Sequence, residues 1–414
     1  MSMKTMNTDV VIIGAGAAGM FAAVIAAKNG LRVLLLEKND RSGKKLAITG
    51  KGRCNVTNAC SAEEVLKNVP RNGRFLYSAI NRFTPEQTMQ FFQEHGCSLK
   101  IERGNRVFPI SDRSADIIEA LEAALKKYHV TRRKATALSL FAQEGKIAAV
   151  KTTEGLISAQ RVILCTGGVS YPLTGSTGDG YRMAEELGHC VVAPVGSLVP
   201  LTSDDDCAQM QGLSLRNTQL QLLDAKGKVV FQDFGELLFT HFGLSGPTVL
   251  SASAHMKAGE RYAIRLDLKP ALDEQKLDAR FLRDFEKYAN RSMENALADL
   301  YPSSMIPVLL RRCGIDPSMK ANSLTKVQRR ALLEQTKRFK IEISGTRPVE
   351  EAIITRGGIH VKEVDPKTMQ SKLVQGLYFA GEILDCDAYT GGFNLQIAWS
   401  TAYTAATACA QPVY

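Results

Sequence analysis

Residues 10–20 read VVIIGAGAAGM, and this stretch decides the fold of the chain. The apolar run Val10–Ile13 predicts a short buried strand, and the glycine-rich turn Gly14–Gly19 follows it directly. Met20–Asn29 is rich in alanine and predicts a helix, which Gly30 ends. A strand, a tight turn and a helix in this order begin a nucleotide-binding βαβ unit.

The returning strand and three glycines complete this fingerprint. Leu31–Leu36 predicts the second strand, and Glu37 closes it, 23 residues after Gly14. Gly14 makes the tight turn, Gly16 lets the backbone approach a pyrophosphate, and Gly19 lets helix and strand pack closely. The carboxylate of Glu37 can accept hydrogen bonds from both ribose hydroxyls, which favours FAD or NAD over NADP.

The composition is typical of a soluble globular protein. The chain has 414 residues, 45% of them hydrophobic and 23% charged, and this length predicts two domains or one domain with a large insertion. Lys and Arg total 52 against 42 Asp and Glu, a net charge of +10, which favours a polyanionic or acidic ligand. Nine cysteines without a Cys-x-x-Cys pair argue against disulfides and structural metal, and predict a reducing cytoplasm.

Val10–Ala27 is free of charge for about the length of a membrane span. Its glycines instead indicate the strand, turn and buried helix described above. Met1–Asp9 carries one Lys and no long apolar stretch, so no secretion signal is predicted. We therefore expect no association with a membrane.

A second glycine-rich segment favours FAD as the dinucleotide. Residues 43–58 read GKKLAITGKGRCNVTN, a loop that can approach phosphates and a flavin ring closely. Arg161–Cys165 predicts a strand that runs into Thr166-Gly167-Gly168, and residues 376–382 (GLYFAGE) predict a strand with an acid at its end. A helix that begins near Asn394 would direct its N-terminal N–H groups at the N1–C2=O edge of the flavin.

These segments give the predicted cofactor contacts and the expected electron donor. The predicted FAD contacts are Gly14, Gly16, Ala17, Ala18, Gly19, Glu37, Lys38, Lys45, Gly52, Arg53, Cys54, Asn55, Thr166, Gly167, Gly381, Glu382, Asn394 and Leu395. No second GxGxxG unit follows Gly168, so we expect NADH or NADPH to visit the flavin transiently. An oxidase would instead pass its electrons to oxygen.

Several blocks of the chain resemble a family of bacterial flavoproteins. The blocks are VVIIGAGAAGM (10–20), GKKLAITGKGRCNVTN (43–58), NGRFLYSAINRF (72–83), TGGVSYPLTGSTGDGY (166–181), LLFTHFGLSGP (237–247) and GLYFAGEILDCDAYTGGFN (376–394). They are similar to the BaiN/YhiN-like FAD-dependent oxidoreductases, some of which are described as aminoacetone oxidases. GRCNVTN and LFTHFGLSGP are the most specific blocks, and Lys51 departs from the family pattern because a glycine is usual at that position.

The resemblance implies an α/β fold: a doubly wound FAD domain of the glutathione-reductase type, interrupted by an inserted β-rich and helical domain. The FAD domain is expected over residues 1–193 and 356–414, and the inserted substrate domain over 194–355. The inserted segment agrees with this expectation. Leu215–Leu223 and Lys228–Phe231 predict a hairpin, Tyr262–Leu268 another strand, and Leu272–Tyr288 and Thr325–Phe339 helices.

Three residues are candidates for managing a proton beside the flavin. His241, between aromatic residues in LFTHFGLSGP, could act as an acid, or could simply bond the backbone of a tight loop. Cys54 and Cys386 carry thiols that could protonate a reduced carbon, although inert packing of a buried cysteine is the more common explanation for both. Tyr171 is a candidate substrate contact that could stack on flavin or substrate, or serve as a core aromatic.

Basic residues gather in the C-terminal part of the inserted segment. Arg329, Arg330, Lys337 and Arg338 are predicted substrate contacts on one side of a helix, although a solvated helix face explains them too. Arg132-Arg133-Lys134 is a second basic cluster. Two such clusters fit a phosphate-rich substrate whose base is held near the flavin.

The resemblance implies two directions for the substrate. Family members have been linked to reduction of a uridine in large-subunit (23S) ribosomal RNA to dihydrouridine, and the net charge of +10 favours this hypothesis. Others have been linked to small-molecule chemistry, either oxidation of an aminoketone or reduction of an activated C=C bond. A flavin- and RNA-binding protein without turnover is the third alternative.

Overall fold

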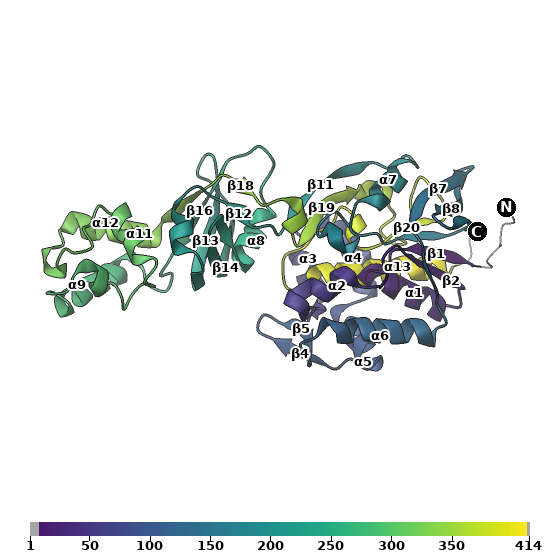
Figure 1. Cartoon of the computed structure of the whole chain (residues 1–414), viewed down its shortest axis with the longest axis horizontal. Helices are drawn as coiled ribbons and strands as arrows, with labels where there is room; N and C mark the ends of the chain where they lie inside the picture. The colour runs from purple at the N-terminus through teal and green to yellow at the C-terminus, as the bar shows by residue number, and fades with distance from the viewer. Residues whose placement is uncertain (1–7, 412–414) are drawn as a thin grey trace. The chain divides into compact units, whose positions relative to one another are not determined.

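A computed structural model describes residues 8–411 of the chain (Figure 1). The chain divides into two compact units, unit 1 formed by Met1–Ser197 and Val349–Tyr414, and unit 2 formed by Leu198–Pro348. These divisions lie four and seven residues from the boundaries drawn on the sequence. Residues 1–7 and 412–414, including most of the N-terminal stretch inspected for a secretion signal, lie outside the described residues.

A five-stranded parallel sheet forms the centre of unit 1. Its strand order is β20-β10-β1-β2-β6, and every neighbouring pair is parallel. The strands are β1 (Val10–Ile13), β2 (Val33–Glu37), β6 (Thr131–Lys134), β10 (Val162–Leu164) and β20 (Leu377–Phe379). Because the strands are parallel, the residues that follow β1, β2, β10 and β20 meet at one edge of the sheet, where ligands bind in doubly wound folds.

Two almost fully buried helices cover this sheet. Helix α1 (Ala17–Lys28) packs against the long helix α13 (Phe393–Cys409) (Figure 1). The N-terminal and C-terminal parts of the sequence therefore lie side by side. Both helices are apolar on nearly all sides, as a helix enclosed between other elements must be. Trp399 of α13 contacts Phe21 and Phe92 edge-on, and all three rings are fully buried.

The rest of unit 1 consists of shorter helices and small antiparallel sheets. Its other helices are α2 (Lys44–Ile48), α3 (Ala62–Lys67), α4 (Gly73–Arg82), α5 (Pro85–Glu94), α6 (Ser114–Lys127) and α7 (Asp179–Glu185). Its small antiparallel sheets are β3 (Thr57–Asn58) with β5 (Arg106–Pro109) and β4 (Leu99–Glu102); β7 (Ala137–Gln143) with β8 (Lys146–Thr152) and β9 (Gly155–Ser158); and β11 (Val191–Ser197) with β19 (Ile354–Ile359).

Unit 2 combines an antiparallel sheet of seven strands with a helical segment. The strand order is β17-β16-β13-β14-β15-β12-β18. The strands are β12 (Leu201–Thr202), β13 (Ser214–Asp224), β14 (Val229–Thr240), β15 (Gly243–Ser245), β16 (Tyr262–Asp267), β17 (Phe339–Ile343) and β18 (Gly345–Thr346). The helices are α8 (Pro247–Ser253), α9 (Glu274–Lys287), α10 (Met293–Ala296), α11 (Ile306–Arg312) and α12 (Lys326–Lys337).

The fold predicted from the sequence is confirmed in its class and in its main elements. The glycine turn joins β1 to α1, and the hairpin of β13 and β14 stands where the alternating pattern predicts it. Helix α1 begins at Ala17, three residues before the predicted start, because the first turn of the helix lies within the glycine motif itself. Among residues 8–411 no helix combines the length and the apolar character that a membrane crossing requires.

Candidate functional site

The turn after β1 gives each of its three glycines a different environment. Gly14 has a φ of +98°, and a Cβ there would lie 2.6 Å from the carbonyl oxygen of Cys165. A Cβ on Gly19 would overlap the carbonyl oxygen of Gly14, so this residue permits the contact of helix and strand. A Cβ on Gly16 would meet no protein atom within 4 Å. The turn is therefore closed at Gly14 and Gly19, and open at Gly16, where a pyrophosphate needs room.

Glu37 is fixed at the end of β2 with its carboxylate beside this turn. One oxygen accepts a hydrogen bond of 2.7 Å from the backbone N–H of Ala15. The other accepts from the backbone and the side chain of Asn39, at 2.8 and 2.7 Å. The carboxylate is thus held between the glycine turn and the loop after β2, in the place expected for the acid that binds the ribose of a dinucleotide.

A cleft of about 660 Å³ opens at this edge of the sheet. It is lined by Ala15, Leu35, Glu37, Asn39, Asp40, Arg41, Ser42, Ala47, Ser114, Ala115, Ile118, Glu119, Glu122, Arg132, Arg133 and Lys134. Its walls come from the glycine turn, the end of β2, helix α6 and the adjacent strand β6. The cluster Arg132-Arg133-Lys134, which the sequence suggested as a contact for a phosphate-rich substrate, lines this cleft, and that contact stays a prediction.

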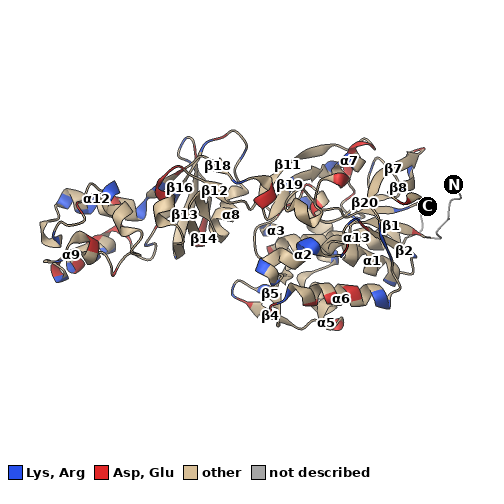
Figure 2. Cartoon of the chain, in the orientation of Figure 1, with Lys and Arg blue, Asp and Glu red and all other residues tan. Residues whose placement is uncertain are grey.

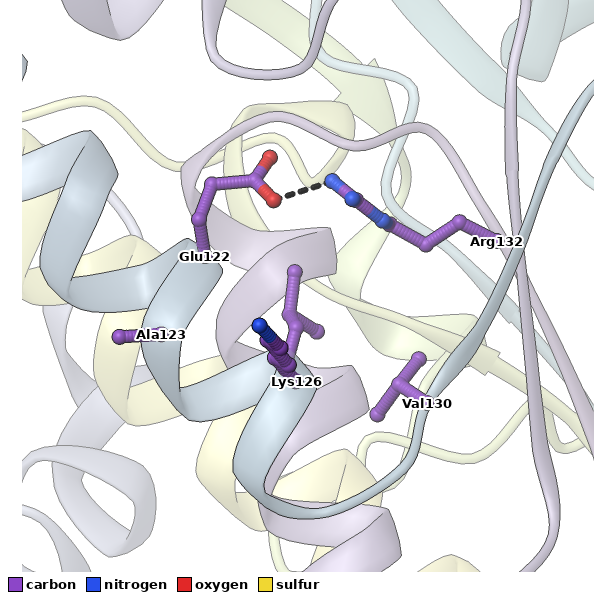
Figure 3. A pocket seen from close by; sticks show the side chains of 6 residues that line it. Glu122, Ala123, Lys126, Val130 and Arg132 are labelled. Carbon is purple, nitrogen blue, oxygen red and sulfur yellow. Dashed lines mark hydrogen bonds and ion pairs between the residues drawn. The ribbon is translucent and has the colours of Figure 1, made fainter.

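A smaller hollow of about 370 Å³ adjoins the cleft between α6 and β6 (Figure 3). An ion pair of Glu122 with Arg132 stands between the two spaces, since both residues line both of them. Lys134 forms another ion pair, with Asp40. The basic residues of β6 are thus offset by carboxylates, and the cleft carries charges of both signs.

A partly buried ion pair joins two of the predicted cofactor residues. Lys45 of α2 donates to both carboxylate oxygens of Glu382, at 2.8 and 2.6 Å. Glu382, which follows β20, also accepts from the hydroxyl of Ser170 at 3.0 Å and from the backbone N–H of Thr355 at 2.9 Å. Lys45 donates to Ser170 as well, at 2.7 Å. Four segments far apart in the sequence therefore meet at the ligand-binding edge of the sheet.

The GKGRCN loop has an unusual backbone. Gly50, Lys51, Gly52 and Cys54 all have positive φ angles, between 57° and 84°. Lys51 is exposed and takes the left-handed backbone conformation that glycine adopts most easily. A lysine at this position, where the family usually has glycine, therefore strains the backbone locally. The guanidinium of Arg53 forms ion pairs with Glu102 and Asp112 and lies 4.2 Å from the centre of the Phe108 ring. Its charge is directed to these side chains, and the predicted contact of Arg53 with FAD stays a prediction.

The start of α13 lies against the end of this loop. Asn58 donates to the carbonyl oxygen of Gly391, and Trp399 donates to that of Val56. Gly392 precedes helix α13, which begins at Phe393. The first backbone N–H groups of α13 have no partner within the helix. The side chain of Asn394 bonds both backbone groups of Ala388, so it holds the preceding loop. A flavin would therefore meet the N–H groups of this helix end, and the side chain of Asn394 would support them.

Within residues 8–411, two buried polar atoms at this edge have no hydrogen-bond partner, the side-chain oxygens of Asn55 and Thr166. An unsatisfied buried polar atom is unfavourable by about 1–3 kcal/mol, and both residues belong to the predicted FAD set. Together with the open space at Gly16, they show that the residues present fit a bound dinucleotide. When FAD is bound, Glu37, the glycine turn, Thr166, Asn55 and the start of α13 would hold it.

The two candidate thiols are both enclosed. Cys54 is fully buried, and burial raises the pKa of its thiol to about 12. Burial also raises the pKa of the Cys386 thiol, and the negative charges of Asp385 and Asp387 raise it further. Asp387 is itself buried and bonded to Arg71 and Ser197. These surroundings favour packing over proton transfer for both cysteines, whose catalytic role stays a hypothesis.

His241 lies in unit 2, at the tight turn between β14 and β15. Its ring is exposed and meets the ring of Phe242 edge-on, at 5.0 Å between centroids. Within the described residues His241 makes no hydrogen bond, so the alternative of an imidazole that bonds the backbone of its loop has no support. The imidazole is free to meet a substrate.

Tyr171 and two residues missed on the sequence lie close to the Lys45–Glu382 pair. Tyr171 is half-buried with a φ of +52°, and Lys45 lies 6.0 Å from the centre of its ring. Ser170 and Thr355 bond to Glu382. Ser170 lies within the block 166–181 but is not among the predicted contacts, and Thr355 lies in none of the blocks that resemble the family. Lys38, predicted to bind the cofactor, forms an ion pair of 2.5 Å with Asp179 at the start of α7.

The basic helix α12 is partly neutralised. Arg329 pairs with Asp278 of α9 at 2.8 Å, and Lys337 pairs with Asp267 at 2.5 Å. Arg338 pairs with Glu274 and Glu334. Arg330 is exposed and, like Lys326 four residues before it, forms no ion pair in the described part of the chain. Figure 2 shows blue segments along α12. Within the described residues, the cations of this helix without an ion pair are Lys326 and Arg330.

Comparisons with known proteins agree with this geometry. The model of the family described as "HI0933-like protein Rossmann domain" matches residues 8–408. The chain is 31% identical over 407 residues to the ribosomal RNA dihydrouridine synthase of Escherichia coli K12, covering 97% of each protein. It is 30% identical to the 3-dehydro-bile acid delta(4,6)-reductase of Clostridium scindens, covering 97% of this chain and 98% of the relative.

Solved structures share the fold at low sequence identity. A 3-ketosteroid-delta4-(5alpha)-dehydrogenase from Rhodococcus jostii aligns with a TM-score of 0.51 and 14% identity, covering 99% of each chain. A 3-ketosteroid delta1-dehydrogenase from Sterolibacterium denitrificans aligns with a TM-score of 0.50 and 14% identity, covering 97% of this chain and 99% of that one. These likenesses show the fold.

Proposed function

The chain belongs to the HI0933-like Rossmann family, and from this premise we propose that it reduces a uridine of large-subunit ribosomal RNA to dihydrouridine. The protein is an FAD-dependent oxidoreductase. The observation that carries the proposal is the full-length similarity to the dihydrouridine synthases of Escherichia coli and Haemophilus influenzae, at 31% and 30% identity.

The residues of unit 1 have separable tasks in this reaction. FAD, when bound, supplies the two-electron chemistry. The open space at Gly16 admits the pyrophosphate, and the carboxylate of Glu37 holds the ribose. Lys45 and Glu382 bring a paired positive and negative charge to the same edge of the sheet. NADH or NADPH is proposed as the electron donor.

Saturating the C5=C6 bond of uridine takes up two electrons and two protons, so a proton donor is needed in addition to the hydride source. His241 is the proposed donor because its imidazole is exposed and free of hydrogen bonds within the described residues. Cys54 and Cys386 are buried thiols and are less suited to meet an RNA base.

Charge favours RNA over a neutral substrate. Segment 269–340 contains 15 Lys and Arg against 9 Asp and Glu, a net of +6 out of +10 for the whole chain. A concentration of positive charge attracts a phosphate backbone and contributes affinity that falls with salt. Lys326 and Arg330 are the proposed phosphate contacts on α12. The other cations of the predicted set, Arg329, Lys337 and Arg338, already form ion pairs with carboxylates.

A small-molecule reductase is the second candidate function. The supporting observation is the similarity to the bile acid delta(4,6)-reductase, which equals that to the RNA enzymes in extent and identity. Reduction of an activated C=C bond is chemically close to reduction of the C5=C6 bond of uridine. The two functions therefore differ in the substrate contacts and can share the flavin site.

The deciding experiment is nucleoside analysis of ribosomal RNA by mass spectrometry. RNA from cells that lack this protein should be missing a dihydrouridine that returns when the wild-type gene is restored. A Gly16→Val gene should not restore it, because that side chain occupies the pyrophosphate position. An unchanged dihydrouridine content in the deletion strain would reject the RNA function and favour the small-molecule one.

The role of His241 can be tested separately. His241→Asn should slow substrate turnover by about a hundredfold, as expected for loss of a general acid, while FAD content and thermal stability stay at wild-type values. The comparison variant is His255→Asn, which also removes an imidazole from unit 2. Equal turnover of wild type and His241→Asn would remove His241 from the mechanism.

A further inference from the structure

One face of the unit 2 sheet is covered by helices and the other is not. Leu220, Leu222, Ile264 and Leu266 point into the buried core of unit 2. Side chains alternate along a strand, so the residues between them point to the opposite face. That face carries Gln219 and Gln221 from β13, Gln232 and Phe234 from β14, and Arg265 from β16.

Phe234 stands near the middle of this face. It is 52% exposed, and it is the one aromatic ring among the exposed large apolar side chains of residues 198–348. Gln219 lies directly opposite it on β13, and Gln232 lies two residues before it on the same strand. A ring with half of its surface in water contributes little to the core, and its exposed π-face is available for stacking.

The neighbours of the ring are hydrogen-bonding groups with spare capacity. Arg265 donates to Gln221 at 2.9 Å, and Gln221 donates to Gln232 at 3.4 Å. The side-chain N–H groups of Gln232 and the side-chain oxygen of Gln219 have no partner among the described residues. The face thus presents a flat ring beside free amide donors and acceptors, with one guanidinium at its border.

This combination matches an unpaired nucleobase better than a phosphate group. A base can stack on the ring while its edge exchanges hydrogen bonds with the amides. A phosphate would need several unpaired cations, whereas on this face Arg265 donates to Gln221 and the adjacent Lys340 is ion-paired with Glu342. The cations of segment 269–340, in the same unit, suit the backbone of the same RNA.

We infer that Phe234 is a stacking platform for an unpaired base of the RNA substrate, with Gln219 and Gln232 reading the edge of that base. This inference rests on the proposed RNA function and adds a binding site for a base other than the one that is reduced. Phe234 is a positioning residue here, because it acts on the RNA and not on the reacting atoms.

The test measures binding of an oligouridylate of about ten nucleotides by the FAD-loaded enzyme over a salt series. Phe234→Ala should weaken binding about tenfold, as expected when one base no longer stacks, with an unchanged slope of affinity against salt. The matched control is Leu282→Ala, which removes another side chain about half exposed in the same unit and should bind as wild type.

A second variant reports stacking directly. The chain has a single tryptophan, Trp399, which is fully buried, so Phe234→Trp adds one exposed indole. Its fluorescence should be quenched as the oligouridylate binds, and affinity should stay at or above the wild-type value. A variant Gln219→Ala/Gln232→Ala should bind more weakly than wild type without a change in the salt slope.

Each outcome separates the stacking site from the RNA function. If the wild-type enzyme binds RNA while Phe234→Ala binds equally well and the introduced indole is not quenched, the stacking site is wrong and the RNA function stands. If the wild-type enzyme binds no RNA, both are wrong. A change in sedimentation of Phe234→Ala without RNA would assign the ring to an interface between two copies of the chain, which also overturns the inference.

Discussion

Gly16 and Gly19 lie three residues apart in one turn but meet different surroundings. Gly16→Ala should lower the FAD content of the purified protein severely while the apo-protein melts near the wild-type temperature, because the added carbon points into space free of protein atoms. Gly19→Ala should destabilise the fold itself, since its Cβ would overlap the carbonyl oxygen of Gly14. Flavin absorbance per chain and thermal melting of both variants measure the difference.

The comparison residue is Gly30, which has a φ of +86° and open space around it. Gly30→Ala should lower stability by about 1 kcal/mol through its backbone conformation and leave FAD content unchanged. If Gly16→Ala instead kept its flavin, the pyrophosphate position assigned to this turn would be wrong.

The carboxylate of Glu37 is the second residue with a distinct prediction. Glu37→Gln keeps the shape of the side chain and removes its charge, so FAD should dissociate about tenfold more readily from the reconstituted apo-protein. Asp40→Asn removes a charge from the lining of the same cleft, at a residue that is ion-paired with Lys134. Similar FAD affinities of both variants would show a general charge effect and contradict a specific ribose contact.

At the scale of elements, His189 joins three segments beside the parallel sheet. Its ring is buried and bonds Glu363 at 3.1 Å and Ser371 at 2.8 Å, which links the end of α7 to the segments before β20. Burial lowers the pKa of His189 below 6.5, despite the opposing effect of Glu363. The folded state therefore binds fewer protons than the unfolded state as the pH falls below that value.

The sign of this difference gives a pH prediction. Stability is fully present above the unfolded pKa and is lost as the pH falls through the interval down to the folded pKa, by at most about 1.4 kcal/mol per pH unit. His189→Gln keeps hydrogen-bonding groups without this titration, so its melting temperature should fall less than that of wild type between about pH 7 and about pH 5. Parallel curves for the two proteins would contradict the assignment.

At the scale of the molecule, charge is distributed unevenly within unit 2. Segment 269–340 has a net charge of +6, whereas residues 198–268 have a net charge of −2, so within unit 2 we expect the salt-dependent RNA affinity to come from segment 269–340. Lys326→Glu/Arg330→Glu should weaken RNA binding across sequences and reduce the salt slope by about one for each phosphate that the variant no longer binds. FAD content and reduction of the bound flavin by NADH or NADPH should stay unchanged.

The control for this prediction uses the paired cations of the same helix. Arg329→Glu would break the ion pair with Asp278 and should lower the melting temperature, which Lys326→Glu should not do. Wild-type RNA affinity and salt slope in Lys326→Glu/Arg330→Glu would remove α12 from the RNA interface.

The sequence by itself determined the features that depend on neighbouring residues. The strand, glycine turn and helix at 10–28 follow from local periodicity and from positions that only glycine can fill, and the acid Glu37 follows from its spacing to that turn. The long hairpin of unit 2 likewise follows from alternation along the chain. These signals are short-range, so the fold class and the dinucleotide site could be predicted.

Only the tertiary structure decided what each charged side chain contacts. Arg53 is directed to Glu102 and Asp112, and Lys45 to Glu382, across separations of 49, 59 and 337 residues. The strength of an ion pair depends on distance and burial, which sequence spacing does not give for residues so far apart. For the same reason the sequence could not show that Arg329 is neutralised by Asp278 while Arg330 stays free, or that Phe234 remains in water on a sheet whose other face is the core.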